Sequence, residues 1–457
     1  MSKNWSKVLK RAAPSNVFLV LAKRLMVLSR SFWALPTFLI IISSALVLFL
    51  VQLDQDLQYS NHSLLVLLND LQPNAALSLM QVVAGSIITI TSIAFSMTLV
   101  VLTMASQQFG PRLIGNFIED RRTQWVLGIL TATFVYCLLA MRAVNTQMGE
   151  AFMPGLTVSM GLVLAIVCVF TLIYFIHHVA ISIQADNVIK KVSQQLGTDF
   201  ETLITQNCNK FNQGIHLFEP DKCAYNQEVT SEYAGYIQGI NYEGMAAYAK
   251  DLSGVIQLQV RTGHHVLCGI ALAKIHSDVQ LSSSEIDLQR FFIMGHERTP
   301  MQDPEFRINQ LVEMALRALS PGINDPYTAI HCIDSLALRL SQLSNMDLSQ
   351  ALVLDEEDHL RVITRQPTFA GLLNCAFDQI RQHALDHVAV VVRLLEVFAQ
   401  LLELSKKQSA NHEAIMAQVQ LIETACANLN MSESERQAVS CRLNACYESQ
   451  SEAMKRE

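Results

Sequence analysis

The chain has 457 residues, of which 51% are hydrophobic and only 16% are charged. Soluble globular chains carry about 25% charged residues, so this composition excludes an entirely soluble protein and predicts that part of the chain lies in lipid. The net charge of −7 argues against nucleic acid as a partner, because nucleic-acid-binding domains carry a basic surface. The ten cysteines are scattered without a CxxC pair, which predicts neither a metal site nor a disulfide framework.

Four stretches after a basic leader, residues 1–31, are long and apolar enough to cross a membrane. A helix needs about 20 apolar residues to span the hydrocarbon core. The sequence therefore predicts a membrane domain over residues 32–185, with transmembrane helices at about 32–53, 75–106, 123–142 and 154–180. No acidic residue falls inside these four expected spans, which argues against a carboxylate relay of the kind found in pumps.

The orientation of the spans follows from the Lys and Arg residues of the short segments between them. The leader is basic, the segment between the first two spans contains Asp but neither Lys nor Arg, and Arg112, Arg121 and Arg122 lie between the second and third spans. Lys190 and Lys191 follow the fourth span. This alternation predicts a multi-pass protein of the bacterial inner membrane with both termini in the cytoplasm.

The second span carries small and hydroxyl residues along one helical face. Their spacings of three, four and seven residues place them in one row, which only Leu99 interrupts: Gly85, Thr89, Ser92, Ser96, Thr103 and Ser106. Small residues in membrane helices allow close helix packing. The same row could instead line a water-filled path. The sequence leaves both interpretations open, a packing stripe or a pore stripe.

The remaining residues predict a cytoplasmic α+β domain. Residues 186–300 are expected to form a linker helix and a β-rich subdomain, a small barrel or sandwich, because glycines separate short β-branched runs between 233 and 294. From Glu305 onward the apolar spacing is helical, so residues 301–457 are expected to form a helical subdomain. Asn324 or Asp325 should cap a new helix that has Pro326 at its first position.

The densest polar segment lies between residues 295 and 329. A structural interpretation needs only helix caps and the helix pair Glu313–Arg317. A functional interpretation gathers the polar side chains around one buried or ligand-binding junction: Glu297, Arg298, Asp303, Glu313, Arg317, Asn324 and Asp325. No motif of a known catalytic site, cofactor site or metal site accompanies them. We therefore name no catalytic residue and expect no cofactor.

Three separated motifs carry a resemblance: residues 91–113, TSIAFSMTLVVLTMASQQFGPRL, residues 173–178, IYFIHH, and residues 318–329, ALSPGINDPYTA. Together they resemble a widespread bacterial family of membrane proteins described only by a domain of unknown function. The resemblance extends from Ser31 to about Leu343. It implies an inner-membrane location and a four-helix layout, and it implies no activity, ligand or catalytic residue.

Three functional hypotheses remain. The first is a homo-oligomeric channel in the lipid bilayer, gated by the cytoplasmic domain and passing or binding an ion or small ligand. The second is a membrane-anchored sensor or scaffold whose helices only pack. The third is a membrane-bound enzyme that uses the polar segment near Asp325. The absence of acidic residues from the four expected spans favours the channel over an active transporter.

Overall fold

The protein divides into two compact units, Met1–Gln107 with Pro111–Gln184, and Gln108–Gly110 with Ala185–Glu457. The structure is a computed structural model. It describes residues 32–58, 73–118, 120–144, 154–211, 224–280, 286–348, 350–355, 357, 359–405 and 408–454. The basic leader and the segments between the first two and the last two spans lie outside the described residues.

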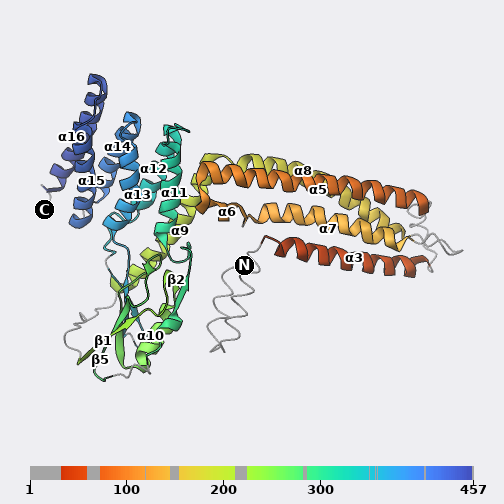
Figure 1. Cartoon of the computed structure of the whole chain (residues 1–457), viewed down its shortest axis with the longest axis horizontal. Coiled ribbons are helices and arrows are strands. Elements are labelled where there is room, and N and C mark those ends of the chain that lie inside the picture. Colours follow the sequence, from red (N-terminus) through yellow and green to blue (C-terminus); the bar gives the residue numbers. More distant parts are fainter. Residues whose placement is uncertain are drawn as a thin grey trace. The chain divides into compact units, whose positions relative to one another are not determined.

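Four long helices run side by side in the first unit (Figure 1). They are α3 (Ala34–Gln58), α5 (Pro73–Phe109), α7 (Arg121–Ala143) and α8 (Gly155–Ser182), with the short η1 (Pro111–Leu113) and α6 (Ile114–Ile118) before α7. Each of the four is long and apolar enough to cross a membrane. At about 1.5 Å per residue, the length of the 37-residue α5 exceeds the thickness of the hydrocarbon core.

Close contacts join these helices to one another. Gly128 of α7 faces Leu39 and the backbone of α3 at Pro36, where a side chain would have no space. On the same helix pair, the Ser43 hydroxyl donates a hydrogen bond of 2.8 Å to the Ala132 carbonyl. α5 packs on α7 and α8 through two buried clusters, which include Met80, Ala84, Ile87, Ala94, Leu130, Tyr136, Val158 and Phe175.

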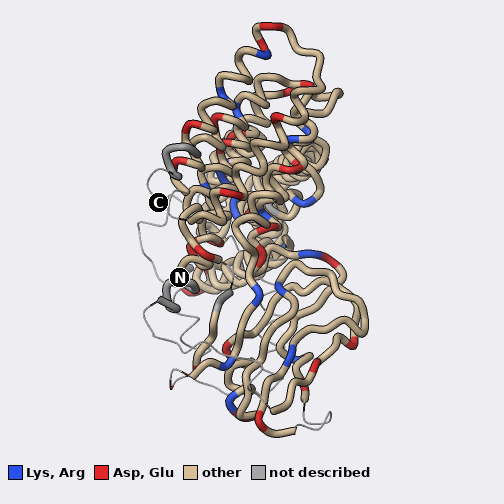
Figure 2. The backbone as a smooth tube through the Cα atoms, turned by 90° about the vertical axis from the view of Figure 1, so that its left-hand side faces the viewer, with Lys and Arg blue, Asp and Glu red and all other residues tan. Residues whose placement is uncertain are grey.

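The second unit joins two open sheets to a set of helices (Figure 1). Its helices are α9 (Ala185–Phe211), α10 (Tyr242–Asp251), α11 (Pro304–Ala318), α12 (Pro326–Leu340), α13 (Phe369–His383), α14 (Val388–Leu404), α15 (Ser409–Ala427) and α16 (Glu433–Met454). Figure 2 shows both signs of charge interspersed over the helices and the sheets of this unit.

The strands form a five-stranded sheet in the order β1-β5-β3-β8-β7 and a three-stranded sheet in the order β4-β2-β6. The strand bounds are β1 (Tyr225–Thr230), β2 (Gly235–Ile240), β3 (Gly254–Leu258), β4 (His265–Val266), β5 (Ala271–Ser277), β6 (Phe292–Gly295), β7 (Gln350–Leu354) and β8 (Leu360–Arg365), with η3 (Gln289–Phe291) before β6. All pairings are antiparallel except β3 with β8, where Ile256 lies opposite Val362. Both sheets and α10 contribute to one buried core.

The fold class expected from the sequence is confirmed: four apolar helices precede a mixed α/β region that ends in helices. The expected small barrel or sandwich is too specific, because β1 and β7 are the outer strands of the larger sheet and the described strands form no closed barrel. A second difference concerns β7 and β8, which lie within residues 301–457, the region expected to be a helical subdomain. Their sheet partner, β3, lies about a hundred residues earlier in the chain, which a local pattern cannot reveal.

Candidate functional site

The small-residue stripe of α5 lies on the outside of the first unit. Gly85, Thr89, Ser92, Ser96 and Thr103 are exposed, and Ser106 is half-buried. The residues that pack inside the bundle are Ala84, Ile87, Thr91, Ala94, Val101 and Ala105. At about 100° per residue, the two sets occupy opposite sides of the helix. Apart from Ser106, the stripe therefore faces away from the packing contacts of the described residues.

The hydroxyl groups of the stripe bond to their own helix. Thr89, Ser92 and Thr103 each donate a hydrogen bond of 2.9 Å to the carbonyl oxygen four residues earlier. An unsatisfied polar group in hydrocarbon costs several kcal/mol, and these internal bonds remove that cost. The stripe is therefore compatible with a dry contact to another helix as well as with water.

The residues predicted to form one polar junction divide into separate groups in the second unit. Arg298 and Asp303 are paired by two hydrogen bonds, Nε to Oδ2 at 2.5 Å and Nη2 to Oδ1 at 3.0 Å. Glu305 joins them through Arg298 Nη2 at 3.0 Å, and Arg261 Nη2 contacts the other oxygen of Glu305 at 2.5 Å. The sequence analysis missed Arg261 and Glu305, since they lie 44 residues apart in the chain.

This four-residue network is balanced in charge, with Asp303 buried and the other three side chains half-buried. The side chain of Asp303 is 0% exposed and that of Glu305 is 14% exposed. Burial lowers the pKa of the Arg298 guanidinium, but its hydrogen bonds with Asp303 and Glu305 outweigh burial and raise the pKa. Gly263, with φ of +84°, passes so close to Asp303 and Arg298 that a Cβ would overlap them. The network holds the loop around Gly263 against the start of α11.

The other predicted residues lie elsewhere. Glu313 and Arg317 form an i,i+4 pair at 3.5 Å on the second half of α11, about 12 Å along the helix axis from Glu305 at 1.5 Å per residue. Asn324 has a φ of +50° in the loop before α12. Asp325 caps α12 and accepts hydrogen bonds from the backbone N–H of Thr328 at 3.1 Å and from its hydroxyl at 2.6 Å. Glu297 is exposed, and its carbonyl oxygen accepts from Gln238.

Gly110, a further residue of the second unit, lies against Glu313, one of the residues predicted to form the polar junction. Its φ is +100°, and a Cβ there would overlap the carboxylate of Glu313. Both features favour glycine, because a φ in this range is strained for other residues. The residues directly after α5 thus pack closely on α11.

His264 lies beside the charge network, and its surroundings favour the neutral imidazole. Burial lowers the pKa of its imidazole, and Arg261 and Arg365 lower it further, to about 4. In the unfolded chain the His264 imidazole has a pKa of about 6.5. Between pH 4 and 6.5 it is therefore protonated in the unfolded state and neutral in the folded state. The contribution of neutral His264 to the free energy of unfolding is therefore fully present above pH 6.5 and is lost as the pH drops toward 4.

We expect the difference in the His264 pKa between the folded and unfolded states to lower the free energy of unfolding by about 2 kcal/mol at pH 5 relative to pH 7.5. Melting temperatures of the full-length protein at the two pH values measure it. His264→Gln should lose less stability on acidification than the parent protein, whereas His265→Gln, at an exposed position, should lose as much. An equal loss for the parent and His264→Gln would contradict the assignment to His264.

Two carboxylates, the buried Asp54 and the half-buried Asp120, anchor the ends of the helices of the first unit. Asp54, near the end of α3, accepts hydrogen bonds from the N–H of Leu156 at 2.9 Å and of Thr157 at 3.0 Å, and from the Thr157 hydroxyl at 2.7 Å. It thus caps α8. The sequence placed Asp54 just outside the first span, whereas α3 continues to Gln58.

At the start of α7, Asp120 contacts His178 of α8 with Oδ2 to Nε2 at 2.6 Å. Burial raises the pKa of the Asp120 carboxyl, but its hydrogen bonds with His178 and Thr123 outweigh burial and lower the pKa. His178 also lies parallel to the ring of Tyr174, with ring centroids 6.0 Å apart. These contacts connect the two helices at this end.

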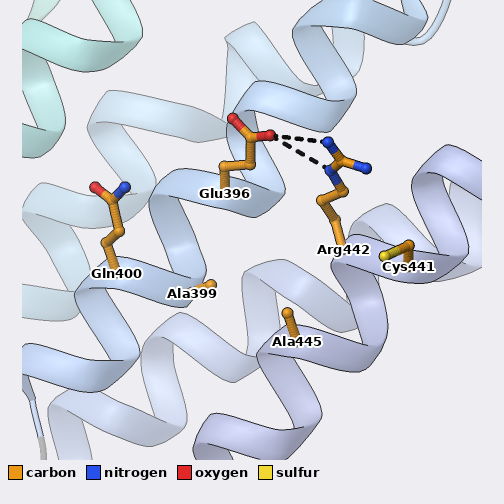
Figure 3. A pocket seen from close by; sticks show the side chains of 6 residues that line it. All are labelled: Glu396, Ala399, Gln400, Cys441, Arg442 and Ala445. Atoms are coloured by element: carbon orange, nitrogen blue, oxygen red, sulfur yellow. Dashed lines mark hydrogen bonds and ion pairs between the residues drawn. The ribbon is translucent and has the colours of Figure 1, made fainter.

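A pocket of about 310 Å³ lies between α14 and α16 (Figure 3). Arg442 reaches across from α16 to Glu396 of α14, Nε to Oε1 at 3.3 Å. The other carboxylate oxygen of Glu396 accepts a hydrogen bond of 3.1 Å from Arg393. The charges at this pocket are therefore already paired with each other.

One group of possible metal ligands occurs among the described residues: Asp355, Glu357 and His359. The carboxylate of Asp355 already accepts from Arg361 at 2.8 Å and from the backbone N–H groups of Glu357 and His359, each at 2.9 Å. Glu357 pairs with Lys250 at 2.9 Å. These partners explain the cluster as a turn between β7 and β8.

Comparison with known proteins identifies the family. The sequence model of the family described as "Predicted membrane protein (DUF2254)" matches residues 29–400. The chain belongs to this family. Its residues are 30% identical over 376 positions to the uncharacterized protein Rv1290c of Mycobacterium tuberculosis and to the uncharacterized protein Mb1321c of Mycobacterium bovis, covering 80% of this chain and 71% of each relative. No solved structure matches the chain significantly.

Membership in the DUF2254 family confirms the resemblance seen in the sequence motifs and makes this chain a membrane protein. The four apolar helices of the first unit are the part that suits a bilayer. The match also extends through α11 and α12 and ends within α14, so the family includes most of the second unit.

Proposed function

We propose that the protein is a homo-oligomeric channel of the bacterial inner membrane in which copies of α5 meet along the small-residue stripe. The observation that carries the proposal is the exposure of this stripe on the side of α5 opposite its packing face. A row of glycine and hydroxyl residues on the outer surface of a membrane helix is the surface that another helix or water would contact.

The outer surface of α8 provides a comparison inside the same bundle. Its exposed residues are large and apolar: Leu162, Val163, Ile166, Val169, Phe170 and Ile173. Such residues suit contact with acyl chains. The stripe of α5 departs from this composition apart from Leu99, whereas the rest of the outer surface of α5, with Val82, Ile93 and Val100 exposed, resembles that of α8. The contrast confined to the stripe supports a different neighbour for this part of α5.

The end of α5 supports gating by the second unit. α5 ends at Phe109, and the next residue, Gly110, packs on Glu313 of α11. A ligand that shifts α11 would therefore act on the residues directly attached to the stripe helix. The ligand and the permeating species belong to the ion or small-molecule class.

The Lys and Arg alternation supports an orientation with both termini in the cytoplasm. In a cysteine-free background, we expect a cysteine at Asp56 to react with an impermeant thiol reagent in intact cells. A cysteine at the exposed Tyr327 should react only after lysis. Labelling of position 327 in intact cells would reverse the proposed orientation.

A second candidate is a membrane-anchored sensor or scaffold. The observation that favours it is that Thr89, Ser92 and Thr103 satisfy their hydroxyl groups within α5, so that the stripe needs no water. In this case copies of α5 pack without a conduit.

Substitutions on the stripe separate the two candidates. Ser92→Leu and Ser96→Leu should each reduce ion flux into liposomes by about tenfold in a channel, because bulk narrows the conduit, and the oligomer should persist. Ser86→Leu is the matched control, since Ser86 is exposed on α5 but lies off the stripe.

Ser96→Asp adds a test of the environment. Facing water, the carboxylate should be tolerated and should shift selectivity toward cations. Facing lipid or a dry interface, it costs roughly 2.5–3.5 kcal/mol on insertion scales, and membrane expression should fall. A folded parent protein without flux at any voltage or pH, whose oligomer dissociates in the Leu variants, would favour the scaffold.

A further inference from the structure

A groove of about 470 Å³ lies between α7 and α8 of the first unit. Its walls are aromatic and aliphatic, and one charged residue lines it. The residues that matter here are Arg122, Trp125, Val167, Phe170, Thr171 and Tyr174. Trp125, Val167, Phe170 and Tyr174 are all substantially exposed, so the groove opens on the outer surface of the bundle.

The groove has a polar end and an apolar body. Arg122 lies in the first turn of α7, which begins at Arg121. No carboxylate among the described residues forms an ion pair with Arg122, and the nearby Asp120 is engaged by His178 and Thr123. The Thr171 hydroxyl donates to the Val167 carbonyl, so the body of the groove offers an apolar surface.

The wall at the polar end is held in place by the contacts already described. Tyr174 lies parallel to His178, and His178 contacts Asp120 at the start of α7. Tyr and Trp side chains of this kind lie at the level of lipid headgroups. The groove is therefore fixed between the two helices, and its Trp and Tyr residues are typical of the membrane–water interface.

We propose that this groove binds one anionic glycerophospholipid, with its phosphate at Arg122 and an acyl chain along Val167 and Phe170. Charge complementarity selects the occupant. A guanidinium that pairs with no carboxylate of the described residues, at the end of an apolar groove, matches an anionic headgroup joined to a hydrocarbon chain, and basic pockets between membrane helices bind such headgroups. This inference rests only on the first unit as a membrane domain and is independent of channel activity.

The test measures phospholipid binding to the full-length protein in detergent by native mass spectrometry. The probes are dioleoyl phosphatidylglycerol and dioleoyl phosphatidylcholine, which share acyl chains, together with inorganic phosphate. Phosphatidylglycerol should bind more tightly than phosphatidylcholine, and inorganic phosphate should not compete. Arg122→Gln should weaken phosphatidylglycerol binding by about fivefold, the effect of one basic residue near a membrane surface.

Arg121→Gln is the matched control, because it removes the same charge one residue away and does not line the groove. It should leave phosphatidylglycerol binding close to that of the parent protein. Val167→Trp, which fills the apolar body, should weaken binding of both phospholipids while the melting temperature stays unchanged.

Three results would overturn the proposal. Equal binding of the two phospholipids would remove the role of the charge. Equal losses in Arg121→Gln and Arg122→Gln would show diffuse attraction and no site. A photo-crosslinker at position 167 of the full-length protein that captures residues of its own leader, and no phospholipid, would show that another part of the chain occupies the groove.

Discussion

Asp303→Ala should destabilise the second unit by about 3–5 kcal/mol, the cost of removing one partner from a buried ion pair. The side chain of Asp303 is fully buried and receives two hydrogen bonds from Arg298. Without it, Arg298 and Arg261 would face the single carboxylate of Glu305. Two guanidinium groups would then share one buried negative charge, and the loop at Gly263 would lose its contact with the start of α11.

Denaturant or thermal unfolding of the full-length protein measures this loss. Asp287→Ala removes a carboxylate of the same unit whose side chain is 62% exposed, and such surface changes are usually within about 0.5 kcal/mol. Asp303→Asn keeps the shape and part of the hydrogen bonding, so it should fall between the parent and Asp303→Ala. A loss below about 1 kcal/mol for Asp303→Ala would mean that the network does not hold this junction together.

Asp54→Ala should cost the helical bundle about 3 kcal/mol, since a hydrogen bond to a charged group contributes about 1.5–3 kcal/mol net and the bonds to one carboxylate do not simply add. Asp54 accepts from two backbone N–H groups and one hydroxyl at the first turn of α8. A carboxylate is also favourable at a helix N-terminus because of the helix dipole. Its removal leaves these donors buried between α3 and α8.

The melting temperature of the detergent-purified protein, followed by size-exclusion chromatography after heating, measures the loss. Asp56→Ala is the control, because Asp56 lies on the same helix two residues later and is exposed. Asp54→Asn retains a carbonyl acceptor and should recover part of the stability. If Asp54→Ala and Asp56→Ala melted alike, the cap of α8 would not contribute to the fold.

Much of the fold could be predicted because its signals are local. The apolar runs that form α3, α5, α7 and α8 are continuous in the sequence, and each reaches the minimum length that the hydrocarbon thickness requires. The N-cap of α12 was equally predictable, since Asp325 and Pro326 are adjacent to the helix that they start. The helix α10 and the strands β7 and β8 were not predicted, because they are stabilised by one shared core of distant residues.

The candidate site shows the same division. The stripe from Gly85 to Ser106 follows from helical spacing, which any sequence displays. Which side of α5 packs inward cannot be read from that spacing, since both sides carry residues compatible with a membrane. The buried residues Ala84, Ile87 and Ala94 decide it, and they leave the stripe on the outer surface.

The sequence by itself determined where this chain can enter a membrane, where its four apolar helices and α12 lie, and which residues are polar. Only the tertiary structure decided which polar residues meet: Arg298 and Asp303 with Arg261 and Glu305, but Glu313 and Arg317 apart from them. The reason is physical. The formation of helices and membrane spans depends on neighbours within a few turns of the chain. A buried charge requires a counter-charge, which can come from any part of the chain that the fold brings near. Here the arginines follow a strand of each sheet, and the carboxylates lie at the start of α11.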